Sequence, residues 1–229
     1  MKAYTRADFF LELSGRTDAD PGRIGEVSRR WDGQASTASL LAALHARLAG
    51  WISPDPFDVK RRALFLFASD CGLMEEGGLS SGHGSTAESV RQLARGEHPA
   101  NRLARLTGTR LVTVNMGTRG LDPVEGVIHV PVMAEGSCNM VREDALTEEA
   151  MMTAVRAGME LASQARDQGM TLLAADGVAE GGKLAATTML AVFFDRKPED
   201  LMPRDPRHDG ELFDRQAYVL SAAVIQREA

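Results

Sequence analysis

From residue 62 onward, short apolar segments alternate with longer amphipathic ones, and this alternation constrains the fold more than any other feature. The apolar segments predict strands over residues 62–69, 111–116, 127–133 and 170–175. The segments between them predict helices over residues 86–94, 99–106, 147–168, 184–194 and 211–227. Strands joined by helices of this length form a mostly parallel sheet with right-handed crossovers. The sequence therefore predicts an α/β fold, a Rossmann-like sheet in a three-layer arrangement.

The residues before this alternation predict a separate helical arm. Apolar positions over residues 22–50 recur at helical spacing, and Ser36–Ser39 supplies a cap between two helices. Pro54 and Pro56 fit neither a helix interior nor a central strand. We therefore predict two domains, an N-terminal helical arm over residues 1–56 and an α/β body over residues 57–229.

Composition excludes several classes of protein. The formal net charge is −6 and no basic cluster is interleaved with aromatic residues, which argues against nucleic-acid binding. No apolar run approaches the roughly 18 residues of a membrane span. The first ten residues lack the apolar core of a signal peptide, and two cysteines without a pairing motif are typical of the cytoplasm. Without a Cys/His cluster at ligand spacing, we expect no metal site.

The first predicted strand ends abruptly in a polar turn, Ser69-Asp70-Cys71-Gly72. Ligands of open α/β sheets bind just beyond the carboxyl ends of the strands, so these side chains are placed for chemistry or ligand binding. Such residues also cap turns routinely. Glu75 and Glu76 follow this turn. Either glutamate is a candidate general base, and both are also typical of an ordinary exposed turn.

A glycine-rich loop, residues 177–183, follows the last predicted strand and precedes a helix. Backbone amides in this setting bind phosphate, and the spacing fits the Gly-x-x-x-x-Gly-Lys phosphate loop. Leu184 stands where that motif requires a hydroxyl for magnesium. Three readings remain open: a true phosphate loop, a glycine turn that packs helix on strand, and phosphate binding of another kind. Glu180 would repel an anion there, and Lys183 would offset it. His83 and His98 lie in or next to glycine- or proline-containing loops, and each is either a ligand contact or a solvated residue.

Taken together, these segments resemble the nicotinate-nucleotide:dimethylbenzimidazole phosphoribosyltransferases, which make the α-ribazole phosphate of the cobalamin lower ligand. The resemblance covers most of residues 20–229, in three blocks that follow the order and spacing of the family's motifs. The blocks are residues 67–77 with 95–96 and 101–105, residues 136–140 with 145–147 and 157–161, and residues 198–201 with 209–210.

This resemblance implies a transferase that moves ribose phosphate from nicotinate mononucleotide to an azole base such as dimethylbenzimidazole and releases nicotinate. It needs no metal or cofactor. Residues of the implied base pocket are Ser69, Asp70, Cys71 and His83. Residues of the implied phosphate or nucleotide site are Gly177, Gly181, Gly182, Lys183 and Asn139. The resemblance assigns no catalytic residue in this chain, and Glu75 and Glu180 are candidates from the residues alone.

The chain also departs from the family pattern. Cys71 stands where the family has a histidine, His83 where it has a glutamine, and Gln216 where a lysine is expected. The residues of the glycine-rich motif also differ from those of the family. The family continues beyond the position of Ala229, in a part that carries the glutamate taken as general base. We therefore expect a homodimer or a hetero-complex that supplies this part. The alternative is a non-catalytic paralogue, or a subunit of a split enzyme, that binds a nucleotide or an aromatic base.

Overall fold

The structure is a computed structural model that describes residues 4–15, 18–32, 39–52, 58–79, 84–130, 132–203 and 210–228. It divides into two compact units, Lys2–Arg61 and Arg62–Ala229. The predicted domain boundary at residues 56/57 lies outside the described residues. Ser36, Pro54 and Pro56 lie outside them as well, and the division into two domains stays a prediction.

The first unit contains three helices among its described residues, α1 (Arg6–Ser14), α2 (Pro21–Trp31) and α3 (Ser39–Ala49). The Thr5 hydroxyl and the Asp8 carboxylate form a reciprocal capping box at the start of α1, a helix that the sequence analysis did not predict. Asp20 caps α2, and Pro21 follows at the first helical position, where its missing N–H costs nothing. Val27 of α2 packs against Ala46 and Ala49 of α3 in a small core.

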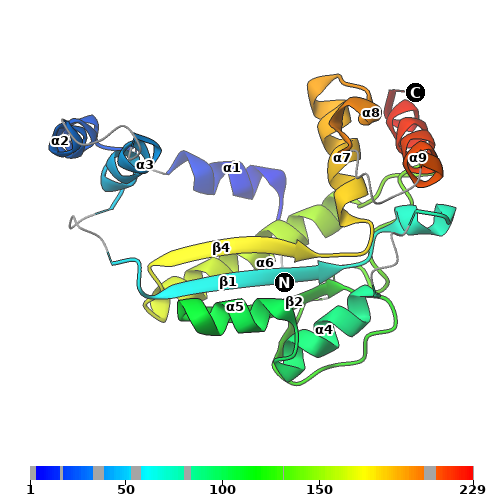
Figure 1. The fold of residues 1–229 in the computed structure, drawn as a ribbon, viewed down its shortest axis with the longest axis horizontal. Coiled ribbons are helices and arrows are strands. Elements are labelled where there is room, and N and C mark those ends of the chain that lie inside the picture. The colour runs from blue at the N-terminus through cyan, green and yellow to red at the C-terminus, as the bar shows by residue number, and fades with distance from the viewer. Residues whose placement is uncertain are drawn as a thin grey trace. The chain divides into compact units, whose positions relative to one another are not determined.

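The second unit is built on a parallel sheet of four strands in the order β3-β2-β1-β4 (Figure 1). The strands are β1 (Arg62–Ser69), β2 (Thr109–Gly117), β3 (Val127–His129) and β4 (Leu172–Val178). The predicted α/β class is confirmed, and β1 has the predicted bounds. The predicted third strand ends early at His129, and β4 starts and ends later than predicted.

Helices cover both faces of β1 and β2. Phe65 of β1 and Val114 of β2 pack against Leu161 of α6 (Glu148–Asp167) on one face. α4 (Thr86–Arg95) and α5 (Pro99–Thr107) lie against the strands on the other. We expected Met151, Val155, Met159 and Ala162 to form one face of α6. The buried residues are instead Met152, Ala157, Leu161 and Ala165, and Ala162 is exposed.

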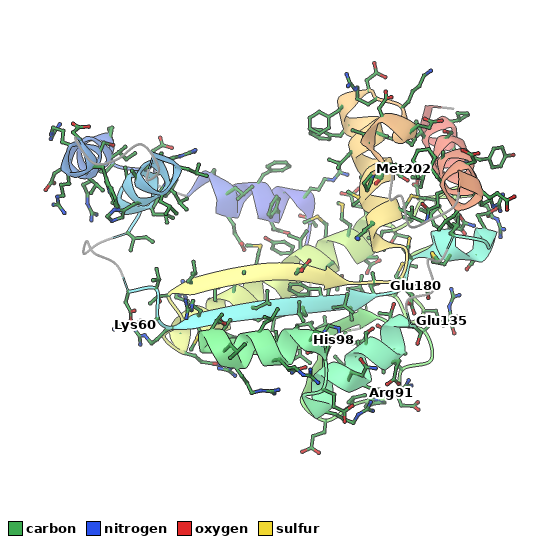
Figure 2. All side chains as sticks on the ribbon, in the orientation of Figure 1. Lys60, Arg91, His98, Glu135, Glu180 and Met202 are labelled. Atoms are coloured by element: carbon green, nitrogen blue, oxygen red, sulfur yellow. The ribbon has the colours of Figure 1, made fainter. Side chains whose placement is uncertain are left out.

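A second core lies beyond the carboxyl end of β4. There, α7 (Gly182–Phe194), α8 (Pro198–Leu201) and α9 (Gly210–Glu228) pack together around Leu184, Met202 and Leu220 (Figure 2). The 3-10 helix η2 (Gly72–Glu76) joins this core through Leu73, which is fully buried. The turn after β1 is thus fixed by apolar packing. No described helix combines the length and the apolar character needed to cross a membrane.

Candidate functional site

A cavity of about 470 Å³ opens at the carboxyl ends of β1 and β2. Its lining residues come from the two strand ends, the loop after β3, the residue before the cap of α6, and α6 itself. They are Phe67, Ser69, Met116, Val132, Met133, Gly136, Leu146, Ala154, Val155 and Gly158. The volume lies within the roughly 300–1,000 Å³ of small-molecule sites, and such sites sit at the carboxyl ends of strands in open α/β sheets. The cavity therefore has the size and place of a ligand site.

Ser69 supplies the only side-chain hydroxyl or charge among the described lining residues. Its Oγ lies 3.4 Å from the Gly117 carbonyl oxygen and 3.5 Å from that of Asp70. Both separations exceed the roughly 2.5–3.0 Å of a good O–H···O bond, so the hydroxyl is only weakly held. An aromatic ligand would pack against apolar side chains and meet one side-chain hydroxyl.

Asp70 does not line the cavity but ties three loops together behind it. Its Oδ2 accepts a hydrogen bond from the Arg119 backbone N–H at 2.7 Å, and its carbonyl oxygen accepts one from the Ser137 N–H at 3.0 Å. Gly136 has a φ of +86°, and a Cβ there would lie 2.3 Å from the Asp70 carbonyl oxygen. Only glycine permits this close approach. Asp70 is therefore a structural residue that fixes the loops next to the cavity.

The two acidic residues after this turn are held by arginines. The Glu75 Oε1 lies 3.2 Å from Arg119, and its Oε2 lies 3.7 Å from Arg142. Glu76 pairs with Arg142 at 2.9 Å and accepts a hydrogen bond from the Asn139 side-chain amide at 2.6 Å. Neither glutamate is among the lining residues. This network joins the η2 segment to the 139–142 loop, and it occupies both oxygens of the predicted base Glu75.

Asn139, predicted at the nucleotide site, is 3% exposed and has both ends of its amide engaged. Besides the bond to Glu76, its Oδ1 accepts a hydrogen bond from the Val141 backbone N–H at 3.0 Å. Asn139 thus shapes its own loop. Any contact with a nucleotide stays a prediction.

Cys71 lies under the glycine-rich loop. A Cβ at Gly181 would lie 2.7 Å from the Met74 Sδ and 3.3 Å from the Cys71 Cβ, so this loop packs directly on the turn after β1. Burial raises the pKa of the Cys71 thiol. A buried thiol with a raised pKa is a poor nucleophile, and Cys71 is therefore a packing residue.

The glycine-rich loop is shorter than a phosphate loop requires. Gly177 belongs to β4, paired with Phe67, and the strand continues to Val178. Only Ala179–Gly181 separate β4 from α7, too few residues to wrap a phosphate in the manner of that motif. Glu180, labelled in Figure 2, donates its backbone N–H to the Thr86 hydroxyl at 3.0 Å and so fastens this turn to α4. The reading as a true phosphate loop is not supported, and the other two readings remain.

The structure thus gathers some predicted residues and separates others. Ser69 lines the cavity, whereas Cys71 and Gly181 contact each other outside its lining. His98 caps α5 by accepting the Ala100 N–H at 3.2 Å. His83 lies outside the described residues. Sequence reasoning missed the apolar lining, which includes Phe67, Met116, Val132, Met133, Leu146 and Val155. The one available signal was their position at or near strand ends and on α6.

A family model described as a phosphoribosyltransferase (DBI_PRT) matches residues 20–229. The chain belongs to this phosphoribosyltransferase family. It is similar to proteins named nicotinate-nucleotide–dimethylbenzimidazole phosphoribosyltransferase. One from Citrifermentans bemidjiense is 29% identical over 223 residues, which cover 97% of this chain and 57% of that protein. One from Alkaliphilus metalliredigens is 27% identical over 185 residues, which cover 80% of this chain and 53% of that protein.

The fold of this chain is also that of a solved structure. The crystal structure of CobT from Thermus thermophilus superposes with a TM-score of 0.79 at 25% identity. The superposition covers 90% of this chain and 63% of the Thermus chain. The chain thus spans between about half and two-thirds of the length of these relatives.

Proposed function

We propose that this phosphoribosyltransferase transfers ribose phosphate from nicotinate mononucleotide to an azole base such as dimethylbenzimidazole and releases nicotinate, as a step of cobalamin biosynthesis. One observation carries the proposal: the cavity at the ends of β1 and β2 has apolar walls and a single hydroxyl, that of Ser69. A benzimidazole presents apolar faces and edges with two ring nitrogens. The names of the relatives point to the same pair of substrates.

In this reaction a benzimidazole nitrogen attacks C1′ of the nucleotide, and a new C–N bond forms. The bond from C1′ to the pyridinium nitrogen breaks, and its electron pair leaves with nicotinate. The other azole nitrogen then gives its proton to a base. Because the cationic leaving group departs readily, the protein mainly orients the two substrates. The cavity supports this role, since its walls would hold the ring in one plane.

We place the phosphate at the amino end of α7, beside Gly181, Gly182 and Lys183. Gly181 caps this helix without a side-chain hydrogen bond. The Gly182 N–H donates to the Ala179 carbonyl oxygen at 3.2 Å, and the following N–H groups of the first turn are left to an outside acceptor. The helix dipole and the Lys183 ammonium would both attract a phosphate there. Gly177 lies in β4 and is a less direct candidate.

The identity of the proton acceptor separates two candidate functions. Glu75 is held by two arginines, and Glu180 lies in the turn before α7. No acidic side chain is among the described residues that line the cavity. This observation favours a site that a further polypeptide completes, in a homodimer or a hetero-complex. It also favours the second candidate, a non-catalytic paralogue or a subunit of a split enzyme.

Nicotinate release tests the proposal. Purified protein is incubated with nicotinate mononucleotide and dimethylbenzimidazole, and nicotinate and α-ribazole phosphate are separated by chromatography. Appearance of both products in equal amounts supports the transferase. If dimethylbenzimidazole binds by calorimetry but neither product forms, even with a candidate partner chain present, the non-catalytic function replaces it.

We further propose that the protein works in the cytoplasm. Cys71 and Cys138 are both free, and unpaired cysteines are usual where thiols stay reduced. Localisation of a tagged chain by cell fractionation tests this assignment.

A further inference from the structure

Asn115 is a buried polar residue outside the proposed substrate contacts. It lies in β2 directly before Met116, a lining residue of the cavity, and is 6% exposed. Its Oδ1 accepts hydrogen bonds from the backbone N–H groups of Gly117 at 3.1 Å and Thr118 at 2.9 Å. The amide Nδ2 lies 3.2 Å from Nδ1 of His129. Turning the amide round would set its NH2 against two backbone N–H donors, so the NH2 group is the end that faces the imidazole.

His129, the last residue of β3, has a hydrogen-bond donor beside each of its ring nitrogens. The Val124 backbone N–H donates to Nε2 at 3.1 Å, and the Asn115 amide NH2 faces Nδ1. A neutral imidazole carries one N–H and one bare nitrogen, so it can accept only one of these two bonds at a time. With the proton on Nδ1 the ring bonds Val124, and with the proton on Nε2 it bonds Asn115. Each arrangement leaves the other donor facing an N–H group.

The two side chains lie behind one wall of the cavity. Asn115 and His129 are register partners in parallel strands. Because side chains alternate along a strand, both lie on the face opposite that of Met116 and Val130, which pack against the α6 core. Neither Asn115 nor His129 lines the cavity. Any effect on a bound base must therefore pass through the backbone.

The backbone that follows His129 forms this wall, since Val132 and Met133 both line the cavity. The Val132 N–H donates to the Met116 carbonyl oxygen at 3.0 Å. A Cβ at Gly117 would lie 2.3 Å from the Met133 carbonyl oxygen, so the wall packs directly on the turn that the Asn115 amide holds.

Few backbone bonds hold the strand that carries the wall. In the described sheet β3 is the outermost strand and spans only Val127–His129. A strand this short makes few ladder bonds, and the side-chain bonds of its last residue are a large share of what holds it. The choice that the His129 ring makes between its two donors therefore bears on how firmly the wall is held.

We propose that Asn115 and His129 are positioning residues for the azole base. The imidazole bonds either the Asn115 amide or the Val124 N–H, so one of two side-chain bonds is always missing and the wall of Val132 and Met133 is only partly fixed. A base that binds must order this wall, and its affinity follows how completely the pair holds β3. This inference rests on the proposed function, which puts the base in this cavity.

The variant Asn115→Asp removes the conflict at Nδ1. One carboxylate oxygen accepts the Gly117 and Thr118 N–H groups, as the amide oxygen does, and the other accepts the Nδ1 proton of His129. Nε2 is then bare and accepts the Val124 N–H, so both bonds form together. Three donors face the carboxylate, which offsets the cost of burying its charge. Calorimetric affinity of the full chain for dimethylbenzimidazole should rise about twofold to tenfold, the range that corresponds to ordering one side chain on binding.

His129→Phe is the matched opposite. It keeps an aromatic ring but offers no nitrogen to either donor, so base affinity should fall by a similar factor. In the His129→Phe background, Asn115→Asp should no longer raise the affinity, because its second oxygen has lost its donor. A role in folding alone would change unfolding temperatures and leave base affinity equal in all four proteins, and that result overturns the proposal. A rise that persists in the His129→Phe background overturns it as well.

The place of the imidazole proton can be read without a ligand. Proton–nitrogen-15 spectra of the ring nitrogens at about pH 8, where histidine side chains are mostly neutral, should show both tautomers of His129 in the parent and the Nδ1–H tautomer alone in Asn115→Asp. His98 is the internal control, because its Nδ1 accepts the Ala100 N–H at 3.2 Å and its proton should stay on Nε2 in both proteins.

The same His129 tautomer in both proteins overturns the proposal. If the tautomer shifts and dimethylbenzimidazole binds neither protein, the proposed function is wrong and the inference falls with it. If the base binds both proteins equally, the proposed function stands and the positioning role alone is refuted.

Discussion

Gly158 offers a direct test of the base site. It lies within α6 and lines the cavity, and a Cβ there would meet no atom within 4 Å. In the variant Gly158→Phe, the new ring would extend into the space proposed for dimethylbenzimidazole. The variant should therefore lose affinity for the base while keeping its fold.

The expected loss follows from the area that an aromatic ring buries. An aromatic group buries about 150–250 Å². At about 25 cal/mol per Å², this burial is worth about 4–6 kcal/mol before the costs of binding. If the new ring displaces half of that contact, the binding free energy weakens by about 2–3 kcal/mol, which lowers the affinity roughly 30-fold to 150-fold. Calorimetric titration with dimethylbenzimidazole measures this loss without requiring turnover.

Two further variants are the controls. Gly158→Ala should raise stability by up to about 1 kcal/mol, because glycine is a poor helix former, and should leave base affinity nearly unchanged. Ala162→Phe adds the same ring to an exposed position of the same helix and should bind the base like the parent. Equal base affinity in Gly158→Phe and Ala162→Phe would refute the placement of the base in this cavity.

Three other predictions concern stability and reactivity. Gly136→Ala should cost about 2 kcal/mol or more in urea unfolding, because its Cβ would lie 2.3 Å from a carbonyl oxygen at a positive φ, whereas Gly84→Ala meets nothing and should be near neutral. Iodoacetamide should modify Cys138 well before the buried Cys71, as peptide mapping would show. Because burial raises the pKa of the Cys71 thiol, the unfolded chain loses this proton first as the pH passes the usual pKa of 9.0. The free energy of unfolding should therefore fall above that pH, and Cys71→Ala should remove this fall. Arg215→Met should destabilise by about 1.5–3 kcal/mol in thermal unfolding, since the guanidinium donates to the carbonyl oxygens of Glu76 and Gly77; an unchanged midpoint would contradict this role.

Local sequence predicted where helices and strands lie better than it predicted which face of a helix is buried. The run from Arg62 to Ser69 gave β1 its observed bounds because apolar and aromatic residues break at once into a polar turn. α6 was predicted as a helix but with the wrong buried face, since Met151, Val155 and Met159 also recur at helical spacing. Which stripe is buried depends on where the helix lies against Phe65 and Val114, which local sequence does not encode.

For the candidate site, too, the sequence predicted some features correctly and the tertiary structure decided others. Ser69 was identified from the sequence because ligand sites follow parallel strands, and it lines the cavity. Asp70 and Cys71, its neighbours, were predicted beside it. The structure turns Asp70 toward Arg119 and buries Cys71 under Gly181. Consecutive residues in a turn point in different directions, so adjacency in sequence did not place them in one pocket.

The sequence by itself determined the order of strands and helices, the parallel sheet that this order requires, and the polar turn after β1. These follow from short-range periodicity and from the handedness of the crossovers. Tertiary structure alone decided the cavity, because its walls join Phe67 with Val155, residues that are far apart along the chain. It also decided which residues of β4 and α7 are exposed in the described part of the chain. The hydrophobic effect is non-directional. The same leucine or phenylalanine is therefore buried in a core or exposed at the surface according to which elements pack beside it.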